Sequence, residues 1–444
     1  MRSKNGLLAA ALGCAVAIAL LGCADDSQPI PSVNLTSSET TVALGQRVTL
    51  AWTTRHASDC SAEGAWSGSK APTGSESVAV PLTQARSTFG LGCTQGSRKA
   101  HAEVVVTIAA PRFAMEKLPL GAAGDLNDEG DVLGYDVNDD PVVWTRAGVL
   151  RVDVGGPWCP PGGTVEPWWV RGLALNNMRT VLVMVHWGPN TDSTCLVALG
   201  SQALPGGVLP IDEPRAMNDS LQVVGRGYWG NQLGVPPPLK EAVLLRSGLA
   251  TLVQPIAGQV GNATVINDAG VVAGHYEIAP GGPVHLFRYD ENGMTKDLGT
   301  SAAGAFPEPL GINAAGTIVG RFGEHAFRVR AGSSAIESLP DLGGSWSMAV
   351  DVNELEQVVG TSALLGAPDT WRATLLSAGT LYDLNDLVVD AEGVTLTDGS
   401  AVNAAGQVLA HDCVEDEDTV GCRVSGVSAD AHRSALACVQ CVRR

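Results

Sequence analysis

The chain has 444 residues, of which 45% are apolar and 17% are charged, and it contains 53 glycines and 25 prolines. This composition excludes an intrinsically disordered chain and is typical of many short strands joined by turns. The formal net charge of −18 repels phosphate backbones and argues against nucleic acid as a partner. The length predicts two or more domains, or a repeat that spreads the core along the chain.

The first residues have the pattern of an export signal. Arg2 and Lys4 precede an uncharged apolar run over residues 6–22, which is too short and wrongly flanked for a stable membrane span. The run ends in Leu-Leu-Gly-Cys at residues 20–23, which resembles the lipobox of bacterial lipoproteins. The resemblance implies that Cys23 becomes the diacylated first residue of the mature chain. The alternative is an ordinary signal peptide that happens to contain a cysteine.

Lipidation would anchor the protein to a membrane without spanning it, so we expect a cell-envelope location, periplasmic or surface-exposed. Ala24 resembles the sorting preference of enteric lipoproteins, which implies the outer membrane. Residues 1–22 would form the signal peptide and residues 23–31 a tether. Without residues 1–22 the formal net charge becomes −20.

Ten cysteines occur, and eight remain once Cys14 of the signal and Cys23 are set aside. In an exported protein an even number favours disulfides, although the sequence leaves their connectivity open. A Cys-x-x-Cys motif at the C-terminal end has zinc or redox spacing, but because no second such motif accompanies it, a disulfide or free thiols are preferred. The simplest scheme pairs neighbours: Cys60–Cys93, Cys159–Cys195, Cys413–Cys422 and Cys438–Cys441.

Residues 32–110 contain short alternating strands broken by Gly, Ser and Pro, which predicts a β-sandwich. In two of these strands, the apolar residues alternate onto one face. Those residues are Val48, Leu50, Trp52, Phe89, Leu91 and Cys93.

Segments 48–54, 59–78 and 89–93 resemble a bacterial immunoglobulin-like module. The resemblance implies that a disulfide between Cys60 and Cys93 joins the two sheets. It does not imply antigen-type recognition, because Trp52 precedes the first cysteine and Leu91 stands where antibody domains have tyrosine. We expect this domain to be a spacer.

One turn motif recurs seven times after residue 111. An apolar residue precedes an asparagine, three turn residues follow, and a β-branched cluster ends in a small residue. Successive copies are 40 to 50 residues apart, a period that suits a propeller blade. The seven asparagines are Asn127, Asn176, Asn218, Asn267, Asn313, Asn353 and Asn403.

The chemistry of the motif predicts a tight hairpin. We expect the asparagine side-chain oxygen to cap its own turn, and the glycine three residues later to adopt a positive φ. The strand after the turn would then be buried. The second, third and sixth copies lack the glycine, which predicts looser turns there.

Between the turns, a second pattern of strand, glycine-containing turn and strand recurs, so each repeat holds about four strands, the content of one propeller blade. Seven copies favour a closed ring, because closure removes exposed sheet edges. We therefore predict an all-β protein: an immunoglobulin-like β-sandwich followed by a seven-bladed β-propeller over residues 111–428 and a C-terminal tail over 429–444. The strand near residues 113–120 should complete the last blade.

The tripeptides His-Ala-Phe at 325–327 and His-Leu-Phe at 285–287 resemble the extracellular repeat family named for His-Ala-Phe. The Asp-Leu-Gly segments that begin at Asp297 and Asp341 resemble the inter-repeat segments of that family. The resemblance spans roughly residues 113–428. It implies a secreted β-repeat fold, and it implies no shared catalytic activity.

Two acidic stretches resemble cation sites without matching them. Residues 125–136 place Asp125, Asn127, Glu129 and Asp131 near a glycine, but the remaining positions of a calcium loop do not fit, so a plain hairpin turn is preferred. The run Glu415–Asp418 is typical of a solvated loop. We predict no metal site and no cofactor.

Tryptophans concentrate in glycine- and proline-rich insertions of the early repeats. Exposed rings there could stack on sugars or bind a protein partner, whereas packing of the insertions against the sheets is the alternative. The candidate contact residues are Trp168, Trp169 and Trp229, with Trp158 and Trp187 nearby.

No zincin, serine-hydrolase, P-loop or dinucleotide motif occurs in the sequence. The leading hypothesis is therefore an envelope protein that binds or scaffolds a protein or glycan partner through its loops. The alternative is a hydrolase or lyase with a site in the central channel, because propellers build sites from loops that are distant in sequence.

Overall fold

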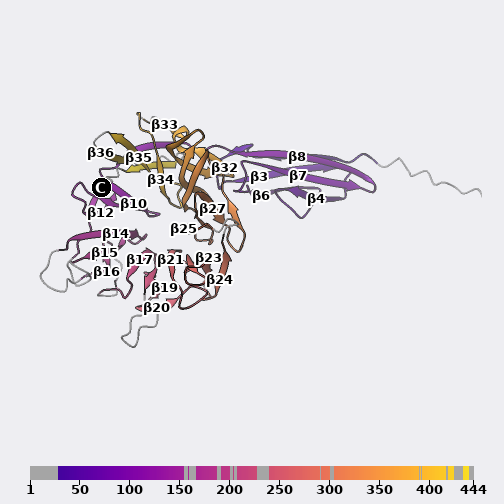
Figure 1. Ribbon diagram of the computed structural model, residues 1–444. Helices are drawn as coiled ribbons and strands as arrows, with labels where there is room; N and C mark the ends of the chain where they lie inside the picture. The colour runs from indigo at the N-terminus through magenta and orange to yellow at the C-terminus, as the bar shows by residue number, and fades with distance from the viewer. Residues whose placement is uncertain are drawn as a thin grey trace, which may run out of the picture. The chain divides into compact units, whose positions relative to one another are not determined.

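The computed structural model describes residues 29–154, 159, 167–187, 192–200, 204, 208–227, 240–290, 292–300, 305–389, 391, 393–416, 419–424 and 434–439 (Figure 1). Within these ranges the chain forms 37 strands and one turn of 3-10 helix, η1 (Leu384–Asp386), so the all-β prediction is confirmed. No helix in the described ranges is both long and apolar enough to cross a bilayer. The chain divides into two compact units near Val105, and the larger also includes Glu39–Val48 and Ala79–Ser87.

Residues 32–108 form two sheets. The first has the strand order β1 (Ser32–Ser37), β3 (Arg47–Arg55), β6 (Thr73–Ala79). The second has the order β2 (Thr41–Val42), β8 (Arg98–Ile108), β7 (Arg86–Gln95), β4 (Asp59–Gly64), β5 (Ser69–Lys70).

The alternation predicted for two of these strands is confirmed, because all six apolar residues of the predicted face are buried. Trp52 also packs edge-on against Trp66, with ring centroids 5.4 Å apart. The indole N–H of Trp52 donates to the carbonyl of Ala71, and that of Trp66 donates to the carbonyl of Gly90. Both indoles are therefore buried with their polar atoms satisfied, as buried tryptophans usually are.

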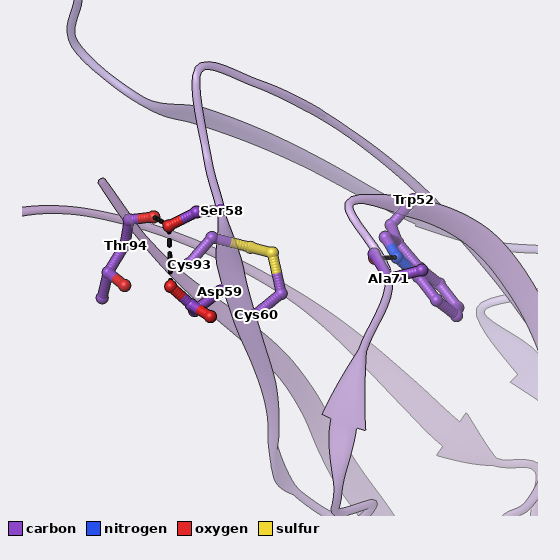
Figure 2. The surroundings of a disulfide bond; sticks show 7 residues. All are labelled: Trp52, Ser58, Asp59, Cys60, Ala71, Cys93 and Thr94. Atoms are coloured by element: carbon purple, nitrogen blue, oxygen red, sulfur yellow. Dashed lines mark hydrogen bonds between the residues drawn. A yellow bond between two sulfur atoms is a disulfide. The ribbon is translucent and has the colours of Figure 1, made fainter. Parts of the chain in front are cut away.

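Cys60 and Cys93 form the predicted disulfide, but the bond lies within one sheet (Figure 2). The two residues are direct partners in the register of β4 and β7, and their Cα atoms are 4.1 Å apart. The expectation that this disulfide joins the two sheets is wrong. Facing sheets lie about 10 Å apart, whereas paired strands lie about 5 Å apart. Paired strands therefore place two cysteines at the shorter distance that a disulfide needs.

After Ile108 the described strands form seven further sheets, which we number as repeats 1 to 7 by the asparagine that each contains. Repeats 1 to 3 consist of β10 (Ala122–Leu126), β11 (Val132–Tyr135), β12 (Pro141–Thr145) and β13 (Gly148–Arg151); β14 (Trp169–Leu175), β15 (Thr180–His186) and β16 (Asp192–Ala198); and β17 (Glu213–Met217), β18 (Val223–Gly227), β19 (Glu241–Arg246) and β20 (Leu249–Leu252).

Repeats 4 to 6 continue the pattern of antiparallel strands in chain order. They consist of β21 (Gly261–Ile266), β22 (Val272–Glu277), β23 (Val284–Tyr289) and β24 (Thr295–Gly299); β25 (Pro307–Ile312), β26 (Ile318–Phe322), β27 (His325–Val329) and β28 (Ile336–Ser338); and β29 (Gly343–Val352), β30 (Val358–Leu364), β31 (Ala367–Ser377) and β32 (Thr380–Asp383). Small antiparallel sheets that follow one another in this way are the arrangement of a β-propeller.

Repeat 7 has a mixed sheet that includes a strand from the start of the larger unit. Its order is β33 (Val388–Val389), β9 (Phe113–Lys117), β37 (Ser434–Val439), β35 (Val408–Asp416), β34 (Asp398–Val402), with β36 (Thr419–Val424) paired to β35. As predicted, β9 joins the last sheet. Residues 434–439, which the sequence analysis assigned to the tail, form a strand between β9 and β35, because this uncharged run contains no Gly or Pro to interrupt pairing.

Hydrophobic clusters join neighbouring repeats. One cluster combines Val224 and Leu244 of repeat 3 with Val272 and Phe287 of repeat 4. Another combines Leu126 and its neighbours in repeat 1 with Leu409 of repeat 7. Figure 1 shows the first strands of the repeats turned inward and the later strands outward. Each core is thus shared between two sheets, so no repeat buries its apolar face alone.

A second predicted disulfide, Cys159–Cys195, is also present, with Cα atoms 5.4 Å apart. Cys413 and Cys422 are backbone partners in β35 and β36. Directly opposed residues in an antiparallel pair lie at a distance that a disulfide spans, so the predicted Cys413–Cys422 bond fits this register. Their side chains and the Cys438–Cys441 pair lie outside the described part of the structure.

Candidate functional site

Each of the seven asparagines caps its own turn, as predicted. The side-chain Oδ1 accepts a hydrogen bond from the backbone N–H four residues later, at 2.8–3.0 Å. In repeat 5, for example, Asn313 accepts from Thr317 at 2.8 Å. These bonds close the hairpin between the first and second strand of every repeat.

The fourth turn residue has a positive φ in all seven copies, including the three without glycine. Arg179, Leu221 and Glu356 have φ values of 58°, 59° and 57°, and their N–H groups donate to the carbonyl of the turn asparagine at 3.0–3.1 Å. The glycine-containing copies have the same bond at 2.9–3.1 Å. The prediction that copies two, three and six have looser turns is therefore wrong.

Contacts with the preceding repeat explain why these three residues tolerate the left-handed conformation. The Arg179 guanidinium donates to the buried carboxylate of Asp131 at 2.6 Å. The Glu356 carboxylate accepts from the Thr317 hydroxyl at 2.8 Å, and Leu221 packs against the apolar cluster around Leu182. A positive φ costs a non-glycine residue about 1–2 kcal/mol, and these contacts offset that cost.

Replacing Arg179 with glycine should therefore lower the free energy of unfolding, although glycine is the usual residue at this position. The Asp131 side chain is only 3% exposed and would lose its cation, at a cost of about 1–3 kcal/mol. Urea unfolding of R179G measures the loss. In a D131N background the loss should vanish or become a small gain, because glycine also relieves the left-handed strain of about 1–2 kcal/mol. An equal loss in both backgrounds would contradict this explanation.

The asparagines also link one repeat to the next. In six cases the side-chain Nδ2 donates to the backbone carbonyl of the asparagine in the following repeat, at 2.9–3.1 Å. One of these bonds runs from Asn403 of repeat 7 to Asn127 of repeat 1. The turns of the first and last repeats are thus hydrogen-bonded neighbours.

The seven turns surround a cavity of about 270 Å³. The residue after each asparagine lines it, and several of these side chains accept a backbone N–H of the adjacent repeat, as Asp128 does from Ala404 and Asp268 does from Asp219. No group of three or more His, Cys, Asp or Glu side chains in the described ranges has the arrangement to hold a metal ion. The seven residues that follow the turn asparagines and line the cavity are Asp128, Asn177, Asp219, Asp268, Ala314, Glu354 and Ala404.

Two half-buried carboxyl groups, Asp125 and Asp351, occupy equivalent positions in repeats 1 and 6. Asp125 accepts the N–H groups of Leu126 and, in the next repeat, Leu175. Asp351 likewise accepts one backbone N–H group of its own repeat and the N–H group of Val402 in repeat 7. These residues therefore connect adjacent repeats. In the calcium-like stretch at 125–136, the described side chains form a hairpin turn and inter-repeat bonds.

Burial raises the pKa of both carboxyl groups from the usual 3.8. The pKa of Asp125 rises to about 6, against the lowering effect of its two backbone hydrogen bonds. The pKa of Asp351 rises to about 7, because burial is reinforced by the negative charges of Asp125 and Asp128. Raised pKa values at a cavity can mark a catalytic acid, but here both oxygens already accept backbone bonds.

The opposite end of the seven repeats, which we call the mouth, is formed where the first strand of each repeat begins. There the residue five before each asparagine pairs in register with the residue eight after it, and most of these pairs are polar. Glu308 and Arg321 are 2.7 Å apart, and Glu213 and Arg226 are 3.6 Å apart. The other polar pairs are Asn262 with His275 and Asp398 with His411.

The two histidines of these register pairs are neutral at physiological pH. Burial, followed by the positive charges of Arg226 and Arg215, lowers the pKa of His275 to about 4. Burial lowers the pKa of His411 to about 4 as well, although the charge of Asp398 acts in the other direction. Both imidazoles are therefore uncharged, and the His411 Nε2 lies 3.0 Å from the Ser400 hydroxyl.

Two of the three predicted contact tryptophans are exposed and lie together. Trp168 is 64% exposed and Trp169 is 42% exposed. Trp169 stacks on the His186 imidazole with ring centroids 5.1 Å apart, Trp168 contacts the same imidazole edge-on, and His186 hydrogen-bonds Asp192. Trp229 and Trp158 lie outside the described residues, and Trp187 is buried in the core shared by repeats 1 and 2.

Two further aromatic residues of the mouth, Phe306 and Trp346, were not predicted from the sequence. Both stand seven residues before their asparagine, as Trp169 does, so the register of the turn motif is the signal that could have found them. Phe306 is 51% exposed. It lies directly before β25, at the start of repeat 5.

No protein-family model and no curated protein sequence matches this chain. Among solved structures, the chain is similar to a streptogramin B lyase at 9% identity, with coverage of 71% of this chain and 97% of that one and a TM-score of 0.39. It is similar to the β-propeller domain of the Trilobed protease from Pyrococcus furiosus at 11% identity, over 79% and 95%, with a TM-score of 0.40. Virginiamycin B lyase from Staphylococcus aureus matches at 10% identity, over 69% and 98%, with a TM-score of 0.25. Similarity this low transfers no activity to the chain.

Proposed function

We propose that the protein is a lipid-anchored cell-envelope protein that binds or scaffolds a protein or glycan partner. In this proposal Cys23 carries the lipid, and residues 32–110 form an immunoglobulin-like spacer. The seven repeats form a closed seven-bladed propeller. Support for closure comes from the bond between Asn403 and Asn127, from the cluster shared by repeats 1 and 7, and from β9 in the last sheet.

The observation that carries the binding proposal is the exposed pair Trp168 and Trp169. Large aromatic side chains usually serve as buried anchors, so two adjacent exposed indoles favour contact with a partner. Their shared contact with His186, which Asp192 hydrogen-bonds in turn, fixes the rings before a partner arrives. Rigid aromatic rings lose little conformational entropy on binding.

Replacing Trp168 and Trp169 with alanine should reduce retention on immobilised cell-envelope fractions and glycan arrays at least tenfold, because both rings would lose their contact area. Folding should be unaffected, since exposed side chains contribute little to stability. Leu249→Ala is the matched control, because Leu249 is 74% exposed but lies in a hairpin at the cavity end of repeat 3. The Trp229→Ala variant is measured in the same retention experiment. Retention that equals that of the control would refute this site.

The alternative, a hydrolase or lyase acting in the central channel, has weaker support. Each of the two carboxyl groups with raised pKa values uses one oxygen to accept a backbone N–H of its own repeat and the other to accept a backbone N–H of the next repeat. A general acid needs an oxygen within reach of its substrate. We therefore favour the binding function, and a screen of glycosidase, esterase and lyase substrates would distinguish the two classes.

A further inference from the structure

In repeats 5 and 6 an aromatic ring lies on a polar side chain of the preceding repeat. The ring of Phe306 contacts the His275 imidazole of repeat 4 edge-on, with centroids 4.7 Å apart. One repeat further on, the Trp346 ring lies 6.0 Å from the Arg321 guanidinium of repeat 5 and packs against Trp371. Aromatic faces and polar groups thus alternate along this part of the mouth.

His275 and its neighbour on the paired strand carry two buried polar atoms without a hydrogen-bond partner in the described structure. They are the Oδ1 of Asn262 and the Nδ1 of His275, which are direct partners in the register of β21 and β22. Asn262 is only 6% exposed. An unsatisfied buried polar atom costs about 1–3 kcal/mol, so an adjacent pair points to a polar group supplied from outside the chain.

The half-exposed Phe306 side chain lies against the imidazole that carries one of these atoms. Rotamer changes of exposed side chains occur within nanoseconds, so a turn of this ring would uncover the imidazole without any movement of the sheets. The ring would then provide an apolar wall beside a neutral histidine and an amide.

The charged groups next to this position are paired with one another. Arg321 bonds Glu308, while Arg226 and Arg215 lie within 4.0 Å of Glu213. Lys240 also bonds Glu213, at 2.7 Å. His275 is uncharged. A phosphate or a carboxylate would have to compete with Glu308 and Glu213 for these cations, whereas an uncharged ligand with hydroxyl groups would not.

We propose that Asn262, His275 and Phe306, with Trp346 on the adjacent repeat, form a subsite for one sugar unit of a neutral oligosaccharide. A hydroxyl group donates to the Asn262 Oδ1, the His275 imidazole bonds a second hydroxyl, and the C–H face of the sugar packs on Phe306. This subsite goes beyond the proposed function and does not depend on Trp168 or Trp169.

Isothermal titration of the chain without residues 1–23 tests the proposal, with cellohexaose, maltohexaose and chitohexaose as neutral probes and an oligogalacturonate as a charged probe. We expect at least one neutral probe to bind, and Phe306→Ala to weaken that binding at least tenfold. Met294→Ala is the matched control, because Met294 is also exposed but lies in the β23–β24 hairpin.

Asn262→Leu separates a binding role from a structural one. A leucine of similar size removes the unsatisfied oxygen, so N262L should unfold at the same or a higher urea concentration than wild type while losing affinity. Lower stability together with unchanged affinity would show that Asn262 is structural and would overturn the proposal. So would binding of the charged probe alone, or of no probe.

The same titration in W168A/W169A distinguishes this subsite from the proposed function. Affinity that persists in W168A/W169A and is lost in F306A supports the subsite, whatever becomes of the tryptophan site. Affinity that is lost in W168A/W169A and retained in F306A refutes the subsite and leaves the proposed function intact.

Discussion

Replacing Asn313 with alanine is expected to lower the free energy of unfolding by about 2–4 kcal/mol. The side chain accepts from the Thr317 N–H and donates to the Asn353 carbonyl at 3.1 Å, and Asn313 is buried, so the change leaves buried donors and acceptors without partners. Urea denaturation measures the loss, with Asn138→Ala as an exposed control that should change stability by less than about 0.5 kcal/mol.

The same substitution at Asn403 tests whether the ring is closed. Asn403 makes its inter-repeat bond to Asn127, which is 276 residues away in sequence. In a closed ring N403A should cost as much as N313A, because both remove a bond between packed neighbours. A cost for N403A near that of the Asn138 control would contradict closure, and a small cost for N313A would contradict the structural role of the turns.

Stability between pH 4 and pH 7 should depend on two opposing pairs of groups. The pKa values of Asp125 and Asp351 are raised, to about 6 and about 7, so the unfolded chain releases these protons at lower pH than the folded chain. Their contribution to stability is therefore present below about pH 4 and is lost as the pH rises to 7. The pKa values of His275 and His411 are lowered to about 4, so their contribution is present above about pH 6.5 and is lost as the pH falls to 4.

Wild-type stability should consequently change little across this range, whereas variants that remove one pair should reveal the other. D125N/D351N should become more stable with rising pH, by a few kcal/mol, since one pKa unit corresponds to about 1.4 kcal/mol. H275Q/H411Q should show the reverse slope. Urea unfolding at intervals of half a pH unit measures all three profiles, and parallel profiles would show that these four groups do not control the pH dependence.

The turn motif shows how local chemistry can be read from sequence while its exceptions cannot. A capping asparagine and a glycine with positive φ follow from the residues of one turn, and four copies have both features. Arg179 and Glu356 adopt the same conformation because their side chains bind the preceding repeat. Those partners are more than 35 residues away, so nothing within the turn predicts the contact.

The candidate sites show a similar division. From the sequence, Trp168 and Trp169 could be exposed or could pack against the sheets, and the tertiary structure decided that they are exposed. The mouth was not visible at all, because Asn262, His275 and Phe306 come from two repeats and form no motif. The intra-sheet position of the Cys60–Cys93 bond was likewise decided by the pairing of β4 with β7.

The sequence by itself determined what depends on short-range chemistry: the strands, their alternation, the seven capped turns and two of the predicted disulfide pairings. Only the tertiary structure decided which side chains from different repeats meet, because packing between sheets, and not the local chain, sets those distances. The buried links of Asp125 and Asp351 to the next repeat, the cavity among the turns and the polar mouth all belong to that second group.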